Sequence, residues 1–150
     1  MRNLRNFGTI LISALLAATG PFASANDLTA PKPLALRQIM KDLGKQMQSV
    51  TDGISREDWD TVEKAGALIA DHPQPPAAEK VRILSYVGTD AGKFRGYDQK
   101  THDTAVELQQ HAQRRDGPAV IAAFANVQNA CLGCHQSFRK PFMEHFYGKP

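Results

Sequence analysis

The sequence has only two cysteines, and both lie in the stretch CLGCH at residues 131–135. It has no patch that mixes lysine and arginine with aromatic residues as nucleic-acid-binding surfaces do, which excludes a nucleic-acid partner. No internal repeat is visible, and no segment has the convincing pattern of a β-strand. These absences leave an all-α chain whose thiols are concentrated in one helical turn.

The first residues contain no acidic side chain and have the features of a secretory signal peptide. MRNLRNFG is basic, TILISALLAATG is apolar, and the small residues ASA at 23–25 fit a cleavage site. The apolar run is too short for a permanent membrane anchor, and a glycine and a proline end it. We therefore predict a signal peptide over residues 1–25, a periplasmic location and no stable membrane insertion.

The predicted mature domain, residues 26–150, is almost neutral. Removing Arg2 and Arg5 with the signal peptide lowers the formal net charge from +3 to +1, so the basic balance belongs mostly to the leader. In the sequence, no charge patch of the mature part is large enough to nominate a docking surface. Its length suits one compact domain with a single core.

Four segments of the mature chain carry apolar residues at helical spacing. They cover about residues 36–50, 59–69, 94–112 and 118–142. The stretch from Ala77 can begin as a helix but breaks at Gly88, and we interpret it as a crossover. The pattern predicts an antiparallel four-helix bundle. Ser55 is the predicted N-cap of the second helix and Asp116 that of the fourth.

Cys131, Cys134 and His135 project from one arc of the fourth predicted helix. At about 100° per residue they fall at about 0°, 300° and 40° around its axis. C-x-x-C-H is the attachment motif of c-type haem, in which the thiols add to two vinyl groups and the imidazole becomes an axial iron ligand. The motif predicts one covalently bound haem c per chain.

Three other interpretations of the two cysteines are weaker. A disulfide would close a very short loop and contribute little stability, even in an oxidising compartment. A zinc site needs a fourth ligand, and the remaining histidines, at 72, 102, 111 and 145, are isolated. A thioredoxin-like motif begins a helix after a strand, whereas here the helical pattern starts upstream of the cysteines.

Together with CLGCH, the dipeptide FR at 138–139 and IMKDLGKQM at 39–47 make the chain resemble the class II cytochromes c. These proteins place C-x-x-C-H near the C-terminus of a four-helix bundle, and the resemblance spans essentially the whole mature chain. IMKDLGKQM is similar to the M-K-x-x-G of the low-spin branch of the cytochrome c′ family, the cytochrome c-556 type. The resemblance implies His135 as the proximal iron ligand and Met40 as the distal one.

Met40 also has other interpretations. A methionine on an apolar helical face often only fills core space, and Met47, two turns further along, is a second candidate ligand. Five-coordinate relatives commonly have an arginine four residues before the distal position, where this chain has Leu36 with Arg37 beside it. Some relatives with a methionine at the distal position still leave the iron open.

A few more residues have predicted places near the haem. Arg139, one turn beyond His135, is either a positive charge near the haem or a solvated cation at a helix end. His102 is expected to be a partly exposed polar residue rather than an iron ligand. The side chains expected to line the core and the haem pocket are Trp59, Phe124, Phe138 and Phe142.

These features predict a periplasmic electron carrier that is not an enzyme and whose partners are redox proteins. The alternative is a five-coordinate protein that binds nitric oxide or carbon monoxide. A peroxidase would need an acid/base group near the iron, whereas apolar Ile39 and Leu43 flank Met40. Class II proteins often pair through their first two helices, so a homodimer remains open beside a monomer.

Overall fold

The computed structural model describes residues 33–148, and the chain is almost entirely helical over that range. The predicted signal peptide, residues 1–25, lies outside the described residues, as do the first residues of the predicted domain. Between residues 33 and 148 there is no β-strand. Within the same range no helix combines the length and the apolar character needed to cross a membrane.

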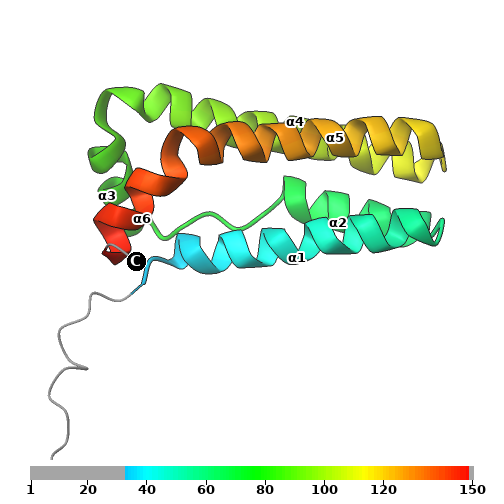
Figure 1. Ribbon diagram of the computed structural model, residues 1–150, viewed down its shortest axis with the longest axis horizontal. Helices are drawn as coiled ribbons and strands as arrows, with labels where there is room; N and C mark the ends of the chain where they lie inside the picture. Colours follow the sequence, from blue (N-terminus) through cyan, green and yellow to red (C-terminus); the bar gives the residue numbers. More distant parts are fainter. Residues whose placement is uncertain (1–32, 149–150) are drawn as a thin grey trace, which may run out of the picture. The chain divides into compact units, whose positions relative to one another are not determined.

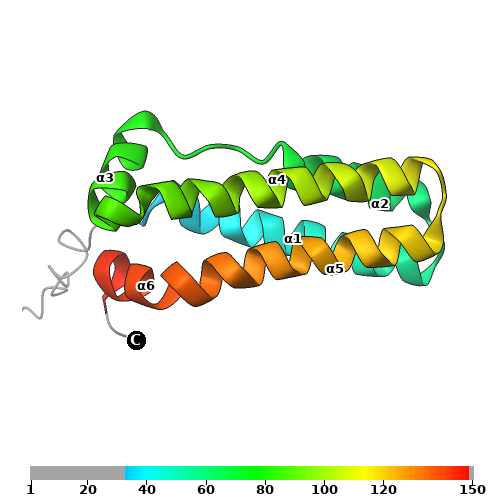
Figure 2. The ribbon, with the colours of Figure 1, turned by 90° about the horizontal axis from the view of Figure 1, so that it is seen from above.

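The described chain forms a four-helix bundle with two additional short helices at one end (Figures 1 and 2). The bundle helices are α1 (Ala35–Ser55), α2 (Trp59–Ala70), α4 (Ala91–Gln113) and α5 (Gly117–Cys134). The additional helices are α3 (Ala77–Val87) and α6 (Lys140–Tyr147), joined to the bundle by the 3-10 turn η2 (Gly88–Asp90) and the π-helix η3 (His135–Arg139). The predicted all-α antiparallel bundle is confirmed.

The turn between α1 and α2 corrects one predicted cap. Ser55 is the last residue of α1, and its hydroxyl donates to the carbonyl oxygen of Asp52 at 2.8 Å. Asp58 caps α2 instead, because its carboxylate accepts the backbone N–H of Thr61 at 3.1 Å and the hydroxyl of Thr61 at 2.7 Å. Glu57, with a φ of 54°, reverses the chain between them. The prediction of Ser55 as N-cap is wrong because α1 runs beyond its apolar pattern.

The turn between α4 and α5 has the same construction and confirms the cap at Asp116. The Asp116 carboxylate accepts the backbone N–H of Ala119 at 3.1 Å, and Pro118 lies in the first turn of α5. Arg115 has a φ of 56°, like Glu57 in the other turn. Its guanidinium also lies 3.2 Å from the carboxylate of Asp60 at the start of α2, which links the two turns.

The predicted crossover contains a helix, α3, which ends at Gly88 with a φ of 53°. Glu79 of α3 has a structural role far away in the sequence. Its carboxylate accepts the backbone N–H groups of Ala35 and Leu36 at 2.7 and 2.8 Å, and so caps α1, whose own N-cap residue makes no side-chain bond. Because the cap joins positions 43 and 44 residues apart, no local pattern reveals it.

The buried side chains form two clusters. The main core lies among α1, α2, α4 and α5, includes Phe124 and is packed by Trp59, as predicted. Its largest fully buried side chains are Val50, Val62, Ile69, Leu108, Val120 and Val127. A second cluster of Leu34, Ile83 and Phe142 joins the start of α1 to α3 and α6. The bundle is therefore held at both ends by different sets of residues.

The length of α2 sets the shape of the region between these clusters. α2 has 12 residues, whereas α1 has 21 and α4 has 23. At 1.5 Å per residue, α2 covers about 18 Å and α1 about 31 Å. Past Ala70 the chain continues as an extended connector, residues 71–76, to α3 (Figure 1). Along this stretch the bundle consists of α1, α4, α5 and the extended connector instead of four helices.

We expect Gly53→Ala to lower the free energy of unfolding by about 1–3 kcal/mol, because overpacking forces neighbouring side chains out of place. A Cβ at this position would lie 2.8 Å from Cγ2 of the fully buried Val62 and 3.1 Å from the carbonyl oxygen of Asp58. Gly96 in α4 has no atom within 4 Å of such a Cβ, so Gly96→Ala is the matched control and should raise stability by about 0.5–1 kcal/mol. Denaturant unfolding followed by circular dichroism measures both, and equal stabilities would contradict the close approach.

Candidate functional site

A cavity of about 700 Å³ lies where the connector takes the place of α2. Residues of α1, the connector, α3, α4, the junction of α5 with η3, and α6 line it. Its volume is in the range of sites that enclose a cofactor-sized ligand, about 300–1,000 Å³. The cavity therefore occupies the space that further turns of α2 would fill.

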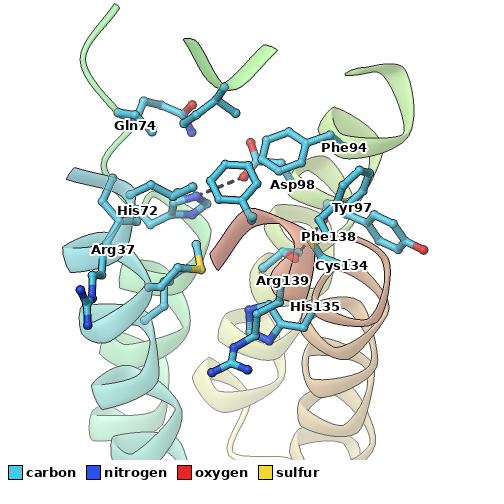
Figure 3. A pocket seen from close by; sticks show the side chains of 18 of the residues that line it. Arg37, His72, Gln74, Phe94, Tyr97, Asp98, Cys134, His135, Phe138 and Arg139 are labelled. Carbon is cyan, nitrogen blue, oxygen red and sulfur yellow. Dashed lines mark hydrogen bonds and ion pairs between the residues drawn. The ribbon is translucent and has the colours of Figure 1, made fainter. Parts of the chain in front are cut away.

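The cavity brings together the four residues singled out from the sequence. Cys131, Cys134, His135 and Met40 all line it. In Figure 3, Cys134 and His135 lie on one side, and Arg37 of α1 and His72 of the connector lie across from them. Met40 comes from the α1 side, belongs to neither core cluster and is 40% exposed.

Met47, the second candidate ligand, has a different environment. It is partly buried against the main core and does not line the cavity. Sequence analysis missed another methionine, Met143 of α6, which does line the cavity. In the sequence, only its position eight residues after His135 connects Met143 with the predicted haem site. Met40 and Met143 are therefore the cavity-lining methionines of the described chain.

A π-helix begins at His135. Such a widened turn is rare and occurs frequently at functional sites. Pro141 follows it in the first turn of α6, where a proline has no N–H to bond back to the carbonyl of Ser137. Past this point α6 turns away from the axis of α5 (Figure 1), and Phe142 joins the second core cluster. The hydroxyl of Tyr86 in α3 donates to the Pro141 carbonyl at 2.9 Å and holds the turn in place.

Gly133 separates the two cysteines at a point where α4 packs directly against α5. A Cβ at 133 would lie 2.8 Å from Cε1 of Tyr97, so the ring occupies the space that a side chain would need. The Tyr97 hydroxyl is 3.3 Å from the hydroxyl of Ser137 in η3. Tyr97 thus fixes the turn that carries the thiols and the turn that follows.

The two thiols lie in a low-polarity environment. Burial raises the pKa of Cys131, and burial together with the nearby Cys131 and Asp98 raises the pKa of Cys134 to about 11. Both groups are therefore protonated at neutral pH, unlike the thiolates of zinc sites and redox motifs. Within residues 33–148, His, Cys, Asp and Glu side chains form no cluster of three able to hold a metal ion by themselves.

The environment of His135 favours its neutral form. Burial lowers the pKa of His135, and the positive charge of Arg139 lowers it further. Neutral imidazole is the form that binds metal ions. Arg139 combines the two alternatives predicted for it. Its side chain is exposed at a helix end, and it also lines the cavity.

Aromatic side chains form a large part of the cavity wall. The ring of Phe94 lies 5.3 Å from that of Phe138, edge to face, and 6.3 Å from that of Phe142, centroid to centroid. The expectation that Phe138 and Phe142 line the pocket is confirmed. Such rings offer a planar apolar ligand extensive contact at small entropic cost.

His72 is a cavity residue that sequence analysis treated only as an isolated histidine. Its Nδ1 donates to the carbonyl of Ile69 at 2.9 Å, and its Nε2 lies 3.2 Å from the carboxylate of Asp98 in α4. Since both acceptors are oxygens without a hydrogen, the doubly protonated ring satisfies both contacts, and the bond to Asp98 raises the pKa of His72. The pair ties the start of the connector to α4.

His102 does not line the cavity, which agrees with its expected polar role. Its Nδ1 donates to the carbonyl of Ala70 at 3.1 Å. Together with the bond from His72 to Ile69, this satisfies two of the last carbonyl groups of α2. The two imidazoles therefore complete the end of the short helix.

These residues fit a planar macrocycle that carries iron and carboxylate groups. Two thiols and an imidazole lie on one side, a thioether comes from α1, the wall is aromatic, and lysine and arginine residues line the remainder. The sequence model of a family described as Cytochrome C' matches residues 34–139, a range that includes all four of these donors. None of the curated proteins compared with the chain matches it.

The pair of His72 and Asp98 should make stability depend on pH. The bond to Asp98 raises the pKa of His72 above 6.5, so this stabilisation is complete below pH 6.5 and is lost as the pH rises through the raised value. The bond to His72 lowers the pKa of Asp98 below 3.8, so its contribution is present above pH 3.8 and is lost on acidification. The ion pair therefore contributes most to stability between about pH 3.8 and pH 6.5.

We expect His72→Gln to cost about 0.5–1 kcal/mol more at pH 5.5 than at pH 9, a modest effect because solvent screens the half-exposed Asp98. Denaturant unfolding of both proteins at each pH measures this. Asp98→Asn should remove the same pH dependence, and the double variant should lose little beyond either single one. A pH-independent difference between wild type and His72→Gln would contradict the ion pair.

Proposed function

The chain belongs to the cytochrome c′ family, whose members carry covalently bound haem c with iron, and from this premise we propose that it is a periplasmic electron carrier. The observation that carries the proposal is that Met40, from α1, and His135, at the start of η3, line the same cavity. A histidine and a methionine are a common axial pair in electron-transfer haems. On the same pair we propose that the chain belongs to the low-spin cytochrome c-556 branch of the family.

Cys131 and Cys134 are the proposed attachment residues. Each thiol would add across one vinyl group of the haem, with its sulfur bonded to one carbon and its hydrogen to the other, so that no oxidant is needed. Tyr97 supports this role by fixing the turn of α5 between the two thiols. Phe94, Phe138 and Phe142 line the cavity and would give a bound haem an apolar surrounding.

His135 and Met40 are the proposed iron ligands. When bound, the haem supplies an iron ion that gains and loses one electron. Both ligands are neutral, and ligands that remain bound in both oxidation states keep structural rearrangement small. A thioether ligand and an apolar surrounding are also the levers by which a protein raises the reduction potential of a haem.

We further propose that the chain is not an enzyme. A haem peroxidase needs an acid/base side chain close to the iron. Besides His135, the cavity-lining imidazole of the described residues is His72, and both of its nitrogens are already engaged with protein oxygens. From α1, the cavity is lined beside Met40 by apolar Leu36, Ile39 and Leu43 and by the exposed cations Arg37 and Lys41, and none of these is a histidine or a carboxylic acid.

A second function has its own support in the same wall. Because Leu36, Ile39 and Leu43 are apolar, a distal face without a bound methionine would admit small uncharged gases. Met40 also belongs to neither core cluster, so core packing does not hold its thioether in one place. The alternative is therefore a five-coordinate protein that binds nitric oxide or carbon monoxide.

Covalent attachment is tested by replacing the thiols. Protein produced together with haem-attachment machinery should keep its colour after acid acetone extraction, because thioether bonds survive it. Cys131→Ser and Cys134→Ser should each reduce the yield of coloured protein sharply, and the double variant should release all haem to the solvent. Ser137→Ala, one turn away, is the control and should keep the pigment. Extraction of haem from wild type would refute the attachment.

The resting ferric spin state separates the carrier from the gas binder. Wild type should be low spin with a weak near-infrared sulfur-to-iron band, and Met40→Ala should become high spin and bind carbon monoxide readily, because the sixth ligand is lost. Met47→Ala and Met143→Ala are matched controls: the first contacts the core, the second the cavity, and both should stay low spin. A high-spin wild type that Met40→Ala leaves unchanged would favour gas binding.

A further inference from the structure

Positive side chains gather around the cavity although they are dispersed in the sequence. The lysine and arginine residues that line it are all exposed: Arg37, Lys41, Lys80, Arg95 and Arg139. They come from α1, α3, α4 and η3, and Figure 3 shows Arg37 and Arg139 on different helical segments of the wall. The one acidic residue of the lining is Asp98. The fold thus creates a basic rim that no continuous stretch of sequence contains.

Nearby acidic groups are occupied by other partners. Glu79 accepts the backbone N–H groups at the start of α1, Asp98 binds His72, and Asp42 binds Lys45 at 2.7 Å. Across residues 33–148, the ion pairs within 4 Å include none of the five rim cations. Within the described chain no rim cation is therefore held in a direct ion pair, although Lys80 helps to lower the pKa of Asp98 and Lys41 that of Asp42.

The other end of the bundle is different. There Arg56 pairs with Asp52 and Asp58, and Arg115 pairs with Asp60 at 3.2 Å. Lys64 and Arg114, away from the cavity, are also outside the ion pairs of the described chain, but five such cations line the one cavity. This concentration produces a local field that attracts anions and increases their rate of arrival.

The haem accounts for only part of this charge. Its two propionate groups carry two negative charges, against five cations on the rim. The cations left over lie on separate elements around the opening, an arrangement that suits an extended surface better than one small anion. The opening is also where a partner comes closest to the contents of the cavity.

We propose that the basic rim is the docking surface for a redox partner protein with an acidic patch. This inference rests on the proposed electron-carrier function and adds the chemistry of the partner and the face that it meets. Charged rims of this kind set the rate and orientation of encounter more than the final affinity. The complex should therefore form fast and weaken as salt is added.

The first experiment measures how the ferrous protein is oxidised by two small probes of opposite charge, ferricyanide and tris(phenanthroline)cobalt(III). In stopped-flow measurements the rate with ferricyanide should fall as ionic strength rises, and the rate with the cobalt complex should rise. Lys80→Gln with Arg95→Gln should lower the ferricyanide rate about 3–10-fold at low ionic strength, because steering is lost. Slopes of the opposite sign, or no effect of the variant, would overturn the inference.

Two control variants separate the effect of the position of the charges from the effects of net charge and of side-chain shape. Lys64→Gln with Arg114→Gln removes the same charge at exposed positions that do not line the cavity, and should change the ferricyanide rate less than 2-fold, about the effect of net charge alone. Lys80→Arg with Arg95→Lys keeps the charge and should retain the wild-type rate. A loss of rate in the charge-conserving pair would mean that shape rather than charge is responsible, and would also overturn the inference.

The second experiment does not depend on electron transfer. Poly-L-glutamate is added to the haem protein, and backbone amide shifts are followed by nuclear magnetic resonance. The shifts should concentrate at Arg37, Lys80 and Arg95, stay small in α2, and disappear at high salt. Uniform shifts would refute the docking surface even if the protein carries electrons. A mapped rim on a high-spin, five-coordinate protein would instead refute the carrier and leave an acidic partner for the gas binder.

Discussion

The early end of α2 at Ala70 is the constraint on which the remainder of the site depends. If α2 were as long as the other bundle helices, it would bury the inward faces of α1 and α4, and the bundle would have a continuous core. Because α2 stops, the cavity opens between them and the chain must span it with an extended connector. Each further feature of this end compensates for the gap.

Three contacts provide that compensation. His72 joins the connector to α4 through Asp98, and Glu79 joins α3 to the start of α1. At the far side the π-helix and Pro141 turn α6 back, so that aromatic rings close the end of the cavity. The bundle thus has a conventional packed core at one end and a space enclosed by specific polar and aromatic contacts at the other.

Sequence patterns predicted the parts of the fold that depend on neighbouring residues. The four bundle helices follow from apolar periodicity, and the cap at Asp116 is correct because the cap and the N–H that it binds are three residues apart. Ser55 and Asp58 both fit a cap, and the choice between them depends on where the turn places the backbone. The pattern predicts only a crossover where α3 lies, because Glu79 and the second core cluster join α3 to distant segments.

The same difference between local and tertiary contacts decides which residues of the site could be predicted from the sequence. Cys131, Cys134 and His135 are adjacent in sequence, so helical geometry alone brings them together. Met40 needed the resemblance to a known family, because nothing local distinguishes it from Met47. His72, Met143 and the basic rim were missed since their proximity depends on the paths of the connector and of α6. Residues that act through tertiary contacts leave no local pattern.

The cap at Glu79 has a consequence for the order in which the molecule assembles. It joins residues more than forty positions apart, so forming it requires the closure of a long loop, which costs more entropy than the short turns of the other end. Folding should therefore begin at the two tight turns and reach the cavity last. The segment that carries Cys131 and Cys134 should then remain accessible while much of the bundle is already formed, until the contacts of α3 and α6 are made.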